Sequence, residues 1–155
     1  MHNNTFSFFV LACTGLLVLG CGDDGGGGSH CPTGEVECDG VCIPEIETTL
    51  EGAQGIQAAV FDISCTLSAC HDSQAPQEML SLISVEVSRA NLIDVEAVQV
   101  SKPRVDPGNV ENSYIINKVL GEGIAPTTLQ MPFGIIPLCD AKIEALVEWV
   151  ALGAP

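Results

Sequence analysis

"SCTLSACHDS", Ser64 to Ser73, is the stretch around which the rest of this sequence is best understood. It holds two cysteines, Cys65 and Cys70, and a histidine, His71, that follows the second cysteine directly. The chain has 155 residues and 3 histidines, and the other two stand within the first 30 residues. Any histidine chemistry in the folded part of the protein therefore belongs to His71.

The first 20 residues have the features of an export signal. "TFSFFVLACTGLLVLG", residues 5–20, is an apolar run of signal-peptide length that ends in small residues, although "MHNNT" before it lacks the usual Lys or Arg. "VLGC", Val18 to Cys21, resembles the lipobox of bacterial lipoproteins. This resemblance implies that Cys21 is lipidated and becomes the mature N-terminus. An uncleaved membrane anchor and a plain signal cut elsewhere are the alternatives.

The rest of the chain divides by composition into a tether and two folded parts. Residues 21–30 are predicted as the lipidated cysteine and a flexible tether, because "GDDGGGGSH" has little side chain to bury. Residues 31–50 form a short Cys-rich segment, and residues 51–155 form the main domain. We therefore expect a cell-envelope lipoprotein that faces the periplasm or the outer surface and is held to the membrane by its lipid.

The net charge of −15 at pH 7 restricts the kinds of partner. Such acidity argues against nucleic acid and against anionic lipid headgroups. It is compatible with an acidic surface that binds a basic partner protein, and also with a role in solubility alone.

The cysteines sort by position. Of the 8 in the chain, six follow the predicted lipidation site, and an even number in an exported protein favours disulfides. The disulfide candidates are Cys31, Cys38 and Cys42 in "CPTGEVECDGVCIP", together with Cys139, which would tie this segment to the C-terminal region. Four cysteines allow three pairings, and the sequence does not choose among them. Zinc binding by these thiolates is disfavoured in an oxidising compartment.

Apolar periodicity predicts a mostly α domain with long loops. "GIQAAVFDIS", Gly55–Ser64, predicts a short helix directly before Cys65, and residues 113–120 predict another that stops at Gly121. Residues 125–137 contain three prolines and are predicted as a loop.

The last helix has the clearest pattern. In "LCDAKIEALVEWVALGAP", residues 138–155, we expect Asp140 to cap the start and Gly153 to end the helix. The β-branched residues in residues 86–100 leave a strand there as an open alternative.

"CTLSACH" is similar to a looser form of C-x-x-C-H, the haem attachment signature of c-type cytochromes. More widely, residues 55–155 resemble the planctomycete-type cytochrome c domain of bacterial lipoproteins. After the Cys/His motif, the short motifs that carry this resemblance are "LSL" (80–82), "VDPGNVENSYIINKVL" (105–120), "QMPFG" (130–134) and "EWVALGA" (148–154).

This resemblance implies a small cytochrome c-like helical domain with one covalent haem c. Cys65 and Cys70 would hold the haem, His71 would be the proximal iron ligand and Met131 the distal one, whereas Met79 stands too close behind His71 in the chain. The implied function is single-electron transfer to a redox partner protein, not enzymatic catalysis.

Further expectations and alternatives accompany this resemblance. In such a fold the first and last helices cross, so we expect Val60 or Phe61 to contact Trp149 and its neighbours. We expect Arg104 to be a solvated surface cation, and the alternative suggested by the resemblance is a partner of a haem propionate. A disulfide-stapled structural or binding lipoprotein without haem, with Cys65 bonded to Cys70, is one alternative. A haem sensor or enzyme subunit is the other.

Overall fold

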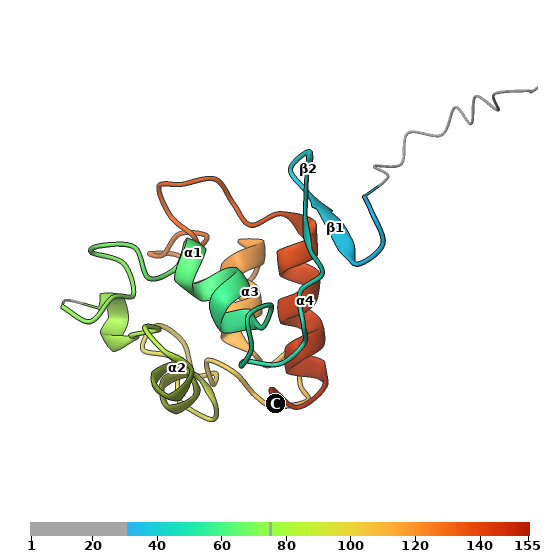
Figure 1. The fold of residues 1–155 in the computed structure, drawn as a ribbon. Helices are drawn as coiled ribbons and strands as arrows, with labels where there is room; N and C mark the ends of the chain where they lie inside the picture. The colour runs from blue at the N-terminus through green and yellow to red at the C-terminus, as the bar shows by residue number, and fades with distance from the viewer. Residues whose placement is uncertain (1–30, 75) are drawn as a thin grey trace, which may run out of the picture.

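The computed structural model describes residues 31–74 and 76–155 (Figure 1). The predictions for the signal peptide, the lipidation of Cys21 and the tether lie outside the described residues. The elements in chain order are β1 (Glu35–Cys38), β2 (Val41–Pro44), the π-helical turn η1 (Gln57–Phe61), α1 (Asp62–Ser64), the 3-10 turn η2 (Gln77–Met79), α2 (Val85–Leu92), α3 (Tyr114–Leu120) and α4 (Asp140–Ala151).

The expectation of a mostly α, cytochrome c-like helical domain is wrong. About 31% of the described residues are helical, and the Cys-rich segment forms a small two-stranded antiparallel sheet. The helices are short because the segments between them contain prolines, which cannot donate a backbone hydrogen bond to a helix. Most of the described chain is therefore held in place by loop contacts and not by regular secondary structure.

The two strands form a tight hairpin. Cys38 pairs with Val41, and the two residues between them, Asp39 and Gly40, both have positive φ angles of 52° and 83°. Positive φ at both central residues is the geometry of the two-residue turn that Asp-Gly favours. Gly40 is therefore a turn residue, as its place between Cys38 and Cys42 in the sequence indicates.

Two disulfides fix the hairpin. Cys31 bonds to Cys42 within the Cys-rich segment, and Cys38 bonds to Cys139 at the start of α4. All four cysteines were disulfide candidates, and the expected tie from Cys139 to this segment is confirmed. In Figure 1 the hairpin accordingly lies beside one end of α4.

The helices near the C-terminus match their predicted positions closely. Helix α3 ends at Gly121, which adopts the left-handed conformation with φ 74°, as expected for a stop signal. Helix α4 begins one residue differently from the prediction: Cys139 is the N-cap, and Asp140 is the first helical residue without a capping hydrogen bond. For residues 86–100, where a strand was the open alternative, α2 occupies the start, and the segment beyond it forms isolated bridges from Ile93 to Val105 and from Glu96 to Pro103 but no named strand.

The core forms where η1 packs against α4. The rings of Phe61 and Trp149 meet edge to face, with 6.4 Å between their centroids and an interplanar angle of 84°. Both side chains are buried, as are Val60 and Val150 beside them. The predicted contact between the first helical segment and the last helix is confirmed.

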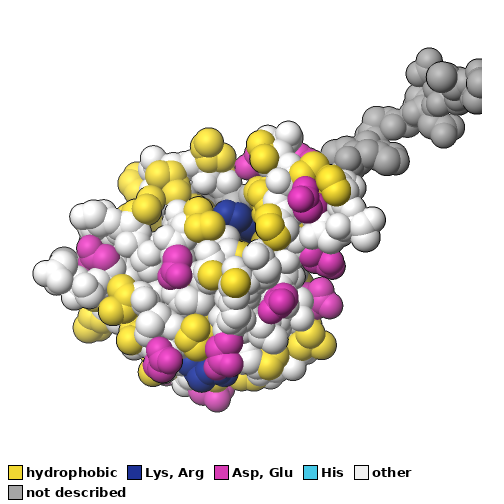
Figure 2. Space-filling model, viewed as in Figure 1, with side chains coloured by type: hydrophobic (Ala, Val, Ile, Leu, Met, Phe, Trp, Pro, Cys, Tyr) yellow, Lys and Arg dark blue, Asp and Glu magenta, His cyan; other side chains and the backbone are white. Residues whose placement is uncertain are grey.

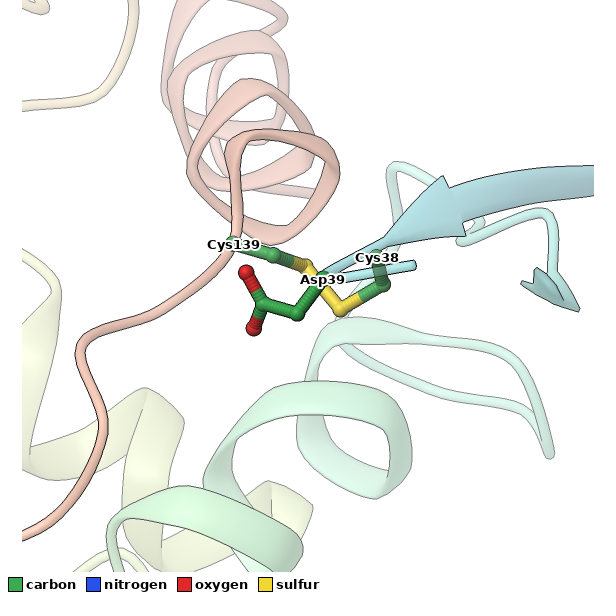
Figure 3. A group of neighbouring side chains, drawn as sticks. All are labelled: Cys38, Asp39 and Cys139. Atoms are coloured by element: carbon green, nitrogen blue, oxygen red, sulfur yellow. A yellow bond between two sulfur atoms is a disulfide. The ribbon is translucent and has the colours of Figure 1, made fainter. Parts of the chain in front are cut away.

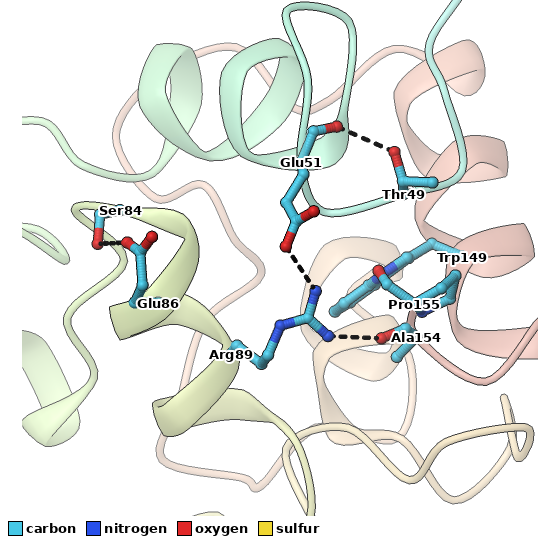
Figure 4. Close-up of polar contacts among 8 residues, drawn as sticks. All are labelled: Thr49, Glu51, Ser84, Glu86, Arg89, Trp149, Ala154 and Pro155. Carbon is cyan, nitrogen blue, oxygen red and sulfur yellow. Dashed lines mark hydrogen bonds and ion pairs between the residues drawn. The ribbon is translucent and has the colours of Figure 1, made fainter.

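The C-terminal residues close the core from below (Figure 4). The indole Nε1 of Trp149 donates to the carbonyl oxygen of Pro155 at 3.0 Å, and the same oxygen accepts from the backbone N–H of Leu50. Arg89 forms an ion pair with Glu51 at 3.4 Å and lies within 3.5 Å of the carbonyl oxygen of Ala154. Within residues 31–74 and 76–155, no helix has the length and apolar character that crossing a membrane requires.

Candidate functional site

A cavity of about 390 Å³ lies between three parts of the chain. These are residues 65–71, which we call the Cys/His loop, helix α3, and the loop that connects α3 to α4. This volume is within the range of about 300–1,000 Å³ that is usual for small-molecule and cofactor sites. Cys65, Cys70, His71 and Met131 all line the cavity. Four of the residues that the sequence singled out are therefore brought to one place.

The Cys/His loop is shaped by its own backbone. The N–H of His71 donates to the carbonyl oxygen of Cys65 at 3.0 Å, and the N–H of Cys70 donates to Leu67 at 2.9 Å. Ala69 takes a positive φ of 66°, which turns the chain back on itself. These contacts return His71 to the neighbourhood of Cys65 despite the four residues between the cysteines.

The imidazole of His71 is held in one tautomer by the chain. Its Nδ1 lies 2.8 Å from the carbonyl oxygen of Leu80. A carbonyl oxygen only accepts, so Nδ1 carries the proton and Nε2 keeps the lone pair. Burial lowers the pKa of His71 below its ordinary value, which favours this neutral form. A hydrogen bond from one ring nitrogen to a backbone carbonyl is typical of a histidine whose other nitrogen binds a metal.

The segment after the loop holds His71 from its backbone as well. The N–H of Leu82 donates to the carbonyl oxygen of His71 at 2.9 Å, so the predicted "LSL" segment contacts the histidine through Leu80 and Leu82. Gln57 donates to the carbonyl oxygen of Leu82 at 2.7 Å and thereby joins this segment to η1.

Cys65 and Cys70 have free thiols, whereas the other four cysteines of the described chain are paired in disulfides. Both free cysteines are half-buried. Burial raises the pKa of Cys65 to about 12. Because the thiolate is the nucleophilic form, Cys65 is poorly suited to act as a catalytic nucleophile near neutral pH.

The two candidate methionines differ in position. Met131 lines the cavity and is half-buried, and its backbone N–H donates to the carbonyl oxygen of Lys118 on α3 at 2.8 Å. Met79 is 74% exposed and does not line the cavity. Of the two, Met131 is the one that could contact a ligand bound in the cavity.

Two cations lie at the cavity wall: Arg104, for which the sequence left a haem-propionate contact as the alternative, and Lys118, which no sequence pattern singled out. Arg104 is 8% exposed, so the expectation of a solvated surface cation is wrong. Lys118 on α3 is half-buried and also lines the cavity. Burial lowers the pKa of both groups. No sequence signal distinguished them, because the burial of a cation is decided by tertiary contacts.

A second cluster of potential metal ligands proves to be structural. Cys38, Asp39 and Cys139 lie together where the hairpin meets α4 (Figure 3). The two sulfur atoms are bonded to each other, so neither offers the thiolate that a metal would need. This geometry agrees with the expectation that zinc is disfavoured here.

Acidic side chains are spread over the surface shown in Figure 2, with few basic ones among them. This matches the net charge of −15.

No family model matches the chain, and neither a curated protein nor a solved structure matches it.

Proposed function

We propose that this protein is a lipid-anchored c-type haem protein of the cell envelope that transfers single electrons. The observation that carries the proposal is the shared cavity: Cys65, Cys70, His71 and Met131 line it together. These residue types are a complete set for one covalent haem c, with two thiols for attachment and two axial ligands.

The donor set fits the group in its chemistry. The thiols of Cys65 and Cys70 are not consumed by a disulfide. The hydrogen bond from Nδ1 of His71 to Leu80 leaves Nε2 as the nitrogen with a lone pair. The thioether of Met131 is a soft, neutral ligand that suits iron in such proteins. When bound, the haem would supply a one-electron iron couple.

The chain's own part in electron transfer is to hold the cofactor rigidly and keep water away. Leu80 and Leu82 fix the side chain and the backbone of His71 through hydrogen bonds of 2.8 and 2.9 Å. Apolar side chains such as Phe61, Leu92 and Leu146 form the cavity floor, and all three are buried. A preorganised site with a largely apolar lining reduces the rearrangement that accompanies a change of charge.

The free thiols weigh against the haem-free alternative. A disulfide-stapled protein in an oxidising compartment would be expected to pair all its cysteines, whereas Cys65 and Cys70 remain unpaired beside a cavity. Met131 at the same cavity weighs against a sensor or enzyme, since a thioether that binds the iron would compete with a substrate for it.

The proposed location and the proposed kind of partner follow from the sequence. Lipidation of Cys21 would place the protein on a membrane facing the periplasm or the outer surface, with residues 22–30 as a tether. The acidic surface would suit a basic redox partner and would disfavour nucleic acid. An enzymatic activity is not part of the proposal.

Haem staining after denaturing electrophoresis tests this function. Protein produced together with a cytochrome c maturation system should retain a haem stain that survives denaturation and reducing agent. The Cys65→Ala and Cys70→Ala double variant should lose the stain while the protein is still exported and folded. A wild-type protein without stain, at normal yield, would contradict the proposal.

A further inference from the structure

We propose that an apolar patch on the loop before α4 docks onto the surface of the membrane to which the lipid anchor holds the protein. The patch consists of four large side chains, Leu129, Phe133, Ile135 and Ile136, which are 54%, 63%, 44% and 77% exposed. Its occupant is the surface of a zwitterionic bilayer. This inference goes beyond electron transfer, because it rests on the proposed lipid anchor and does not depend on the haem.

The patch lies in a stretch of chain without charge. Residues 123–139 contain no acidic or basic side chain, although the whole chain holds 20 Asp and Glu residues and 5 Lys and Arg residues. Single exposed apolar side chains are ordinary on protein surfaces, whereas several large ones together mark an interaction site. In Figure 2, hydrophobic side chains gather along the upper edge of the molecule, where Figure 1 places this loop.

Two disulfides fix the patch beside the start of the described chain. The chain enters the folded part at Cys31, which bonds to Cys42 of the hairpin. Cys38 of the same hairpin bonds to Cys139, which stands directly behind the loop. Ile136 lines a small cavity together with residues of the hairpin. The patch therefore lies on the side of the domain at which the anchored segment joins it, as Figure 1 shows for the loop, the hairpin and the first described residues.

The length of the anchored segment restricts which face can lie on the membrane. From Cys21 to Cys31 a fully extended chain spans at most about 35 Å. A domain the size of residues 31–155 has a diameter of about 35 Å, and a chain that ran around it from its far side to the membrane would need at least about 45 Å. The face opposite the hairpin is therefore kept from lying on the membrane, whereas the patch can reach it easily.

The size of the patch favours a membrane over a free protein partner. A stable protein–protein interface takes about 20–30 residues on each side, far more than this patch offers. Docking of an anchored protein needs less contact, because the lipid already keeps the membrane at a high local concentration.

The charges beside the patch indicate the kind of lipid. Glu37, Asp39 and Asp140 line the same small cavity as Ile136, and they would repel anionic headgroups. A zwitterionic bilayer avoids this repulsion. Leu129 and Phe133 also line the larger cavity, so docking would bring this side of that cavity to the bilayer surface.

Photocrosslinking from lipid acyl chains locates the docked surface. Full-length protein is produced with a cytochrome c maturation system, shown by mass spectrometry to carry lipid on Cys21, and reconstituted into phosphatidylcholine vesicles that contain a lipid with a diazirine in its acyl chain. After illumination, the protein is reduced and digested with trypsin. Cleavage after Lys118 and Lys142 gives residues 119–142, which hold the whole patch, and residues 143–155, which hold Leu152 at 60% exposure. We expect several-fold more lipid adducts on the first peptide than on the second.

Substitutions of exposed side chains assign the adducts to the patch. Phe133→Ser combined with Ile136→Ser should reduce the adducts on residues 119–142 several-fold, because the two most exposed side chains of the patch are lost. Leu152→Ser, the matched change outside the patch, should leave them unaltered. Replacing half of the phosphatidylcholine with phosphatidylglycerol should also reduce them. Equal adducts on the two peptides, or unaltered adducts in the double variant, would overturn the inference.

The outcome is separable from that of the haem stain. Lipidated protein with a positive stain but without adducts on the patch leaves electron transfer standing and overturns the docking. Adducts on the patch of a protein without stain support the docking and contradict covalent haem. Protein without lipid on Cys21 contradicts the anchor and the docking together. If the patch gives no adducts and Cys21→Ser protein forms dimers that the double variant does not, the patch binds a second copy and the inference is overturned.

Discussion

Removal of the Cys38–Cys139 disulfide should destabilise the protein more than removal of the Cys31–Cys42 disulfide. The first bond joins residues 101 apart in sequence and the second joins residues 11 apart. In the chain-entropy description, a crosslink restricts the unfolded chain more when it closes a longer loop. The comparison uses two matched double variants, Cys38→Ala with Cys139→Ala and Cys31→Ala with Cys42→Ala.

The size of the difference follows from the loop lengths. Loops of these lengths correspond to roughly 4.7 and roughly 2.8 kcal/mol of stabilisation at 25 °C, so the long-loop variant should lose roughly 2 kcal/mol more. Cys139 is 7% exposed, and the lost packing of its sulfur atom adds to the cost in the same direction. The Cys38–Cys139 bond also ends the loop that carries Met131, so its loss should loosen the cavity.

Urea unfolding followed by far-ultraviolet circular dichroism measures both effects. The free energy of unfolding is compared between the two variants and wild type, and the denaturant slope reports whether the unfolded state has expanded. Equal losses, or a larger loss for the short-loop variant, would refute the argument from loop length.

Three further predictions concern the core and the cavity. Trp149→Ala should cost roughly 3–5 kcal/mol, because the indole is fully buried against Phe61, and a loss below about 1 kcal/mol in urea unfolding would contradict this. In haem-free protein at pH 8, iodoacetamide should alkylate Cys65 more slowly in the folded than in the urea-unfolded chain, since burial raises its pKa to about 12; equal rates by mass spectrometry would disprove the burial. In haem-loaded protein, Met131→Ala should lower the reduction potential, within the span of roughly 0.8 V that axial ligands cover, and Met79→Ala should leave it unchanged; the reverse result in a redox titration would show that the wrong methionine was chosen.

Local signals predicted α3 and α4 well, whereas α2 lies in a segment for which a strand was left open. The stop at Gly121 is a property of one residue, since glycine adopts the required positive φ without strain. The apolar stripe of α4 places Leu146 and Val150 in the core, where both are fully buried. The fold class was nevertheless wrong, because apolar periodicity and the resemblance both favoured helices, whereas the Cys-rich segment forms a two-stranded sheet and the helices are short.

The sequence likewise predicted some features of the candidate site and not others. The spacing of Cys65, Cys70 and His71 indicated the Cys/His motif. Met131 was preferred to Met79 because Met79 follows His71 too closely in the chain. The sequence predicted that Cys139 is tied to the Cys-rich segment, but neither its partner there nor the burial of Arg104 could be predicted, because each depends on which distant segments pack together. The support of His71 by the Leu80 carbonyl is likewise a backbone contact that no side-chain identity encodes.

The most direct test of the central claim is a mass measurement of the peptide that contains Cys65 and Cys70. Wild-type protein is produced with a cytochrome c maturation system, digested under non-reducing conditions and analysed by mass spectrometry. The account predicts one haem bound covalently to the peptide through both cysteines. A haem-free peptide that carries a disulfide between Cys65 and Cys70 would contradict it.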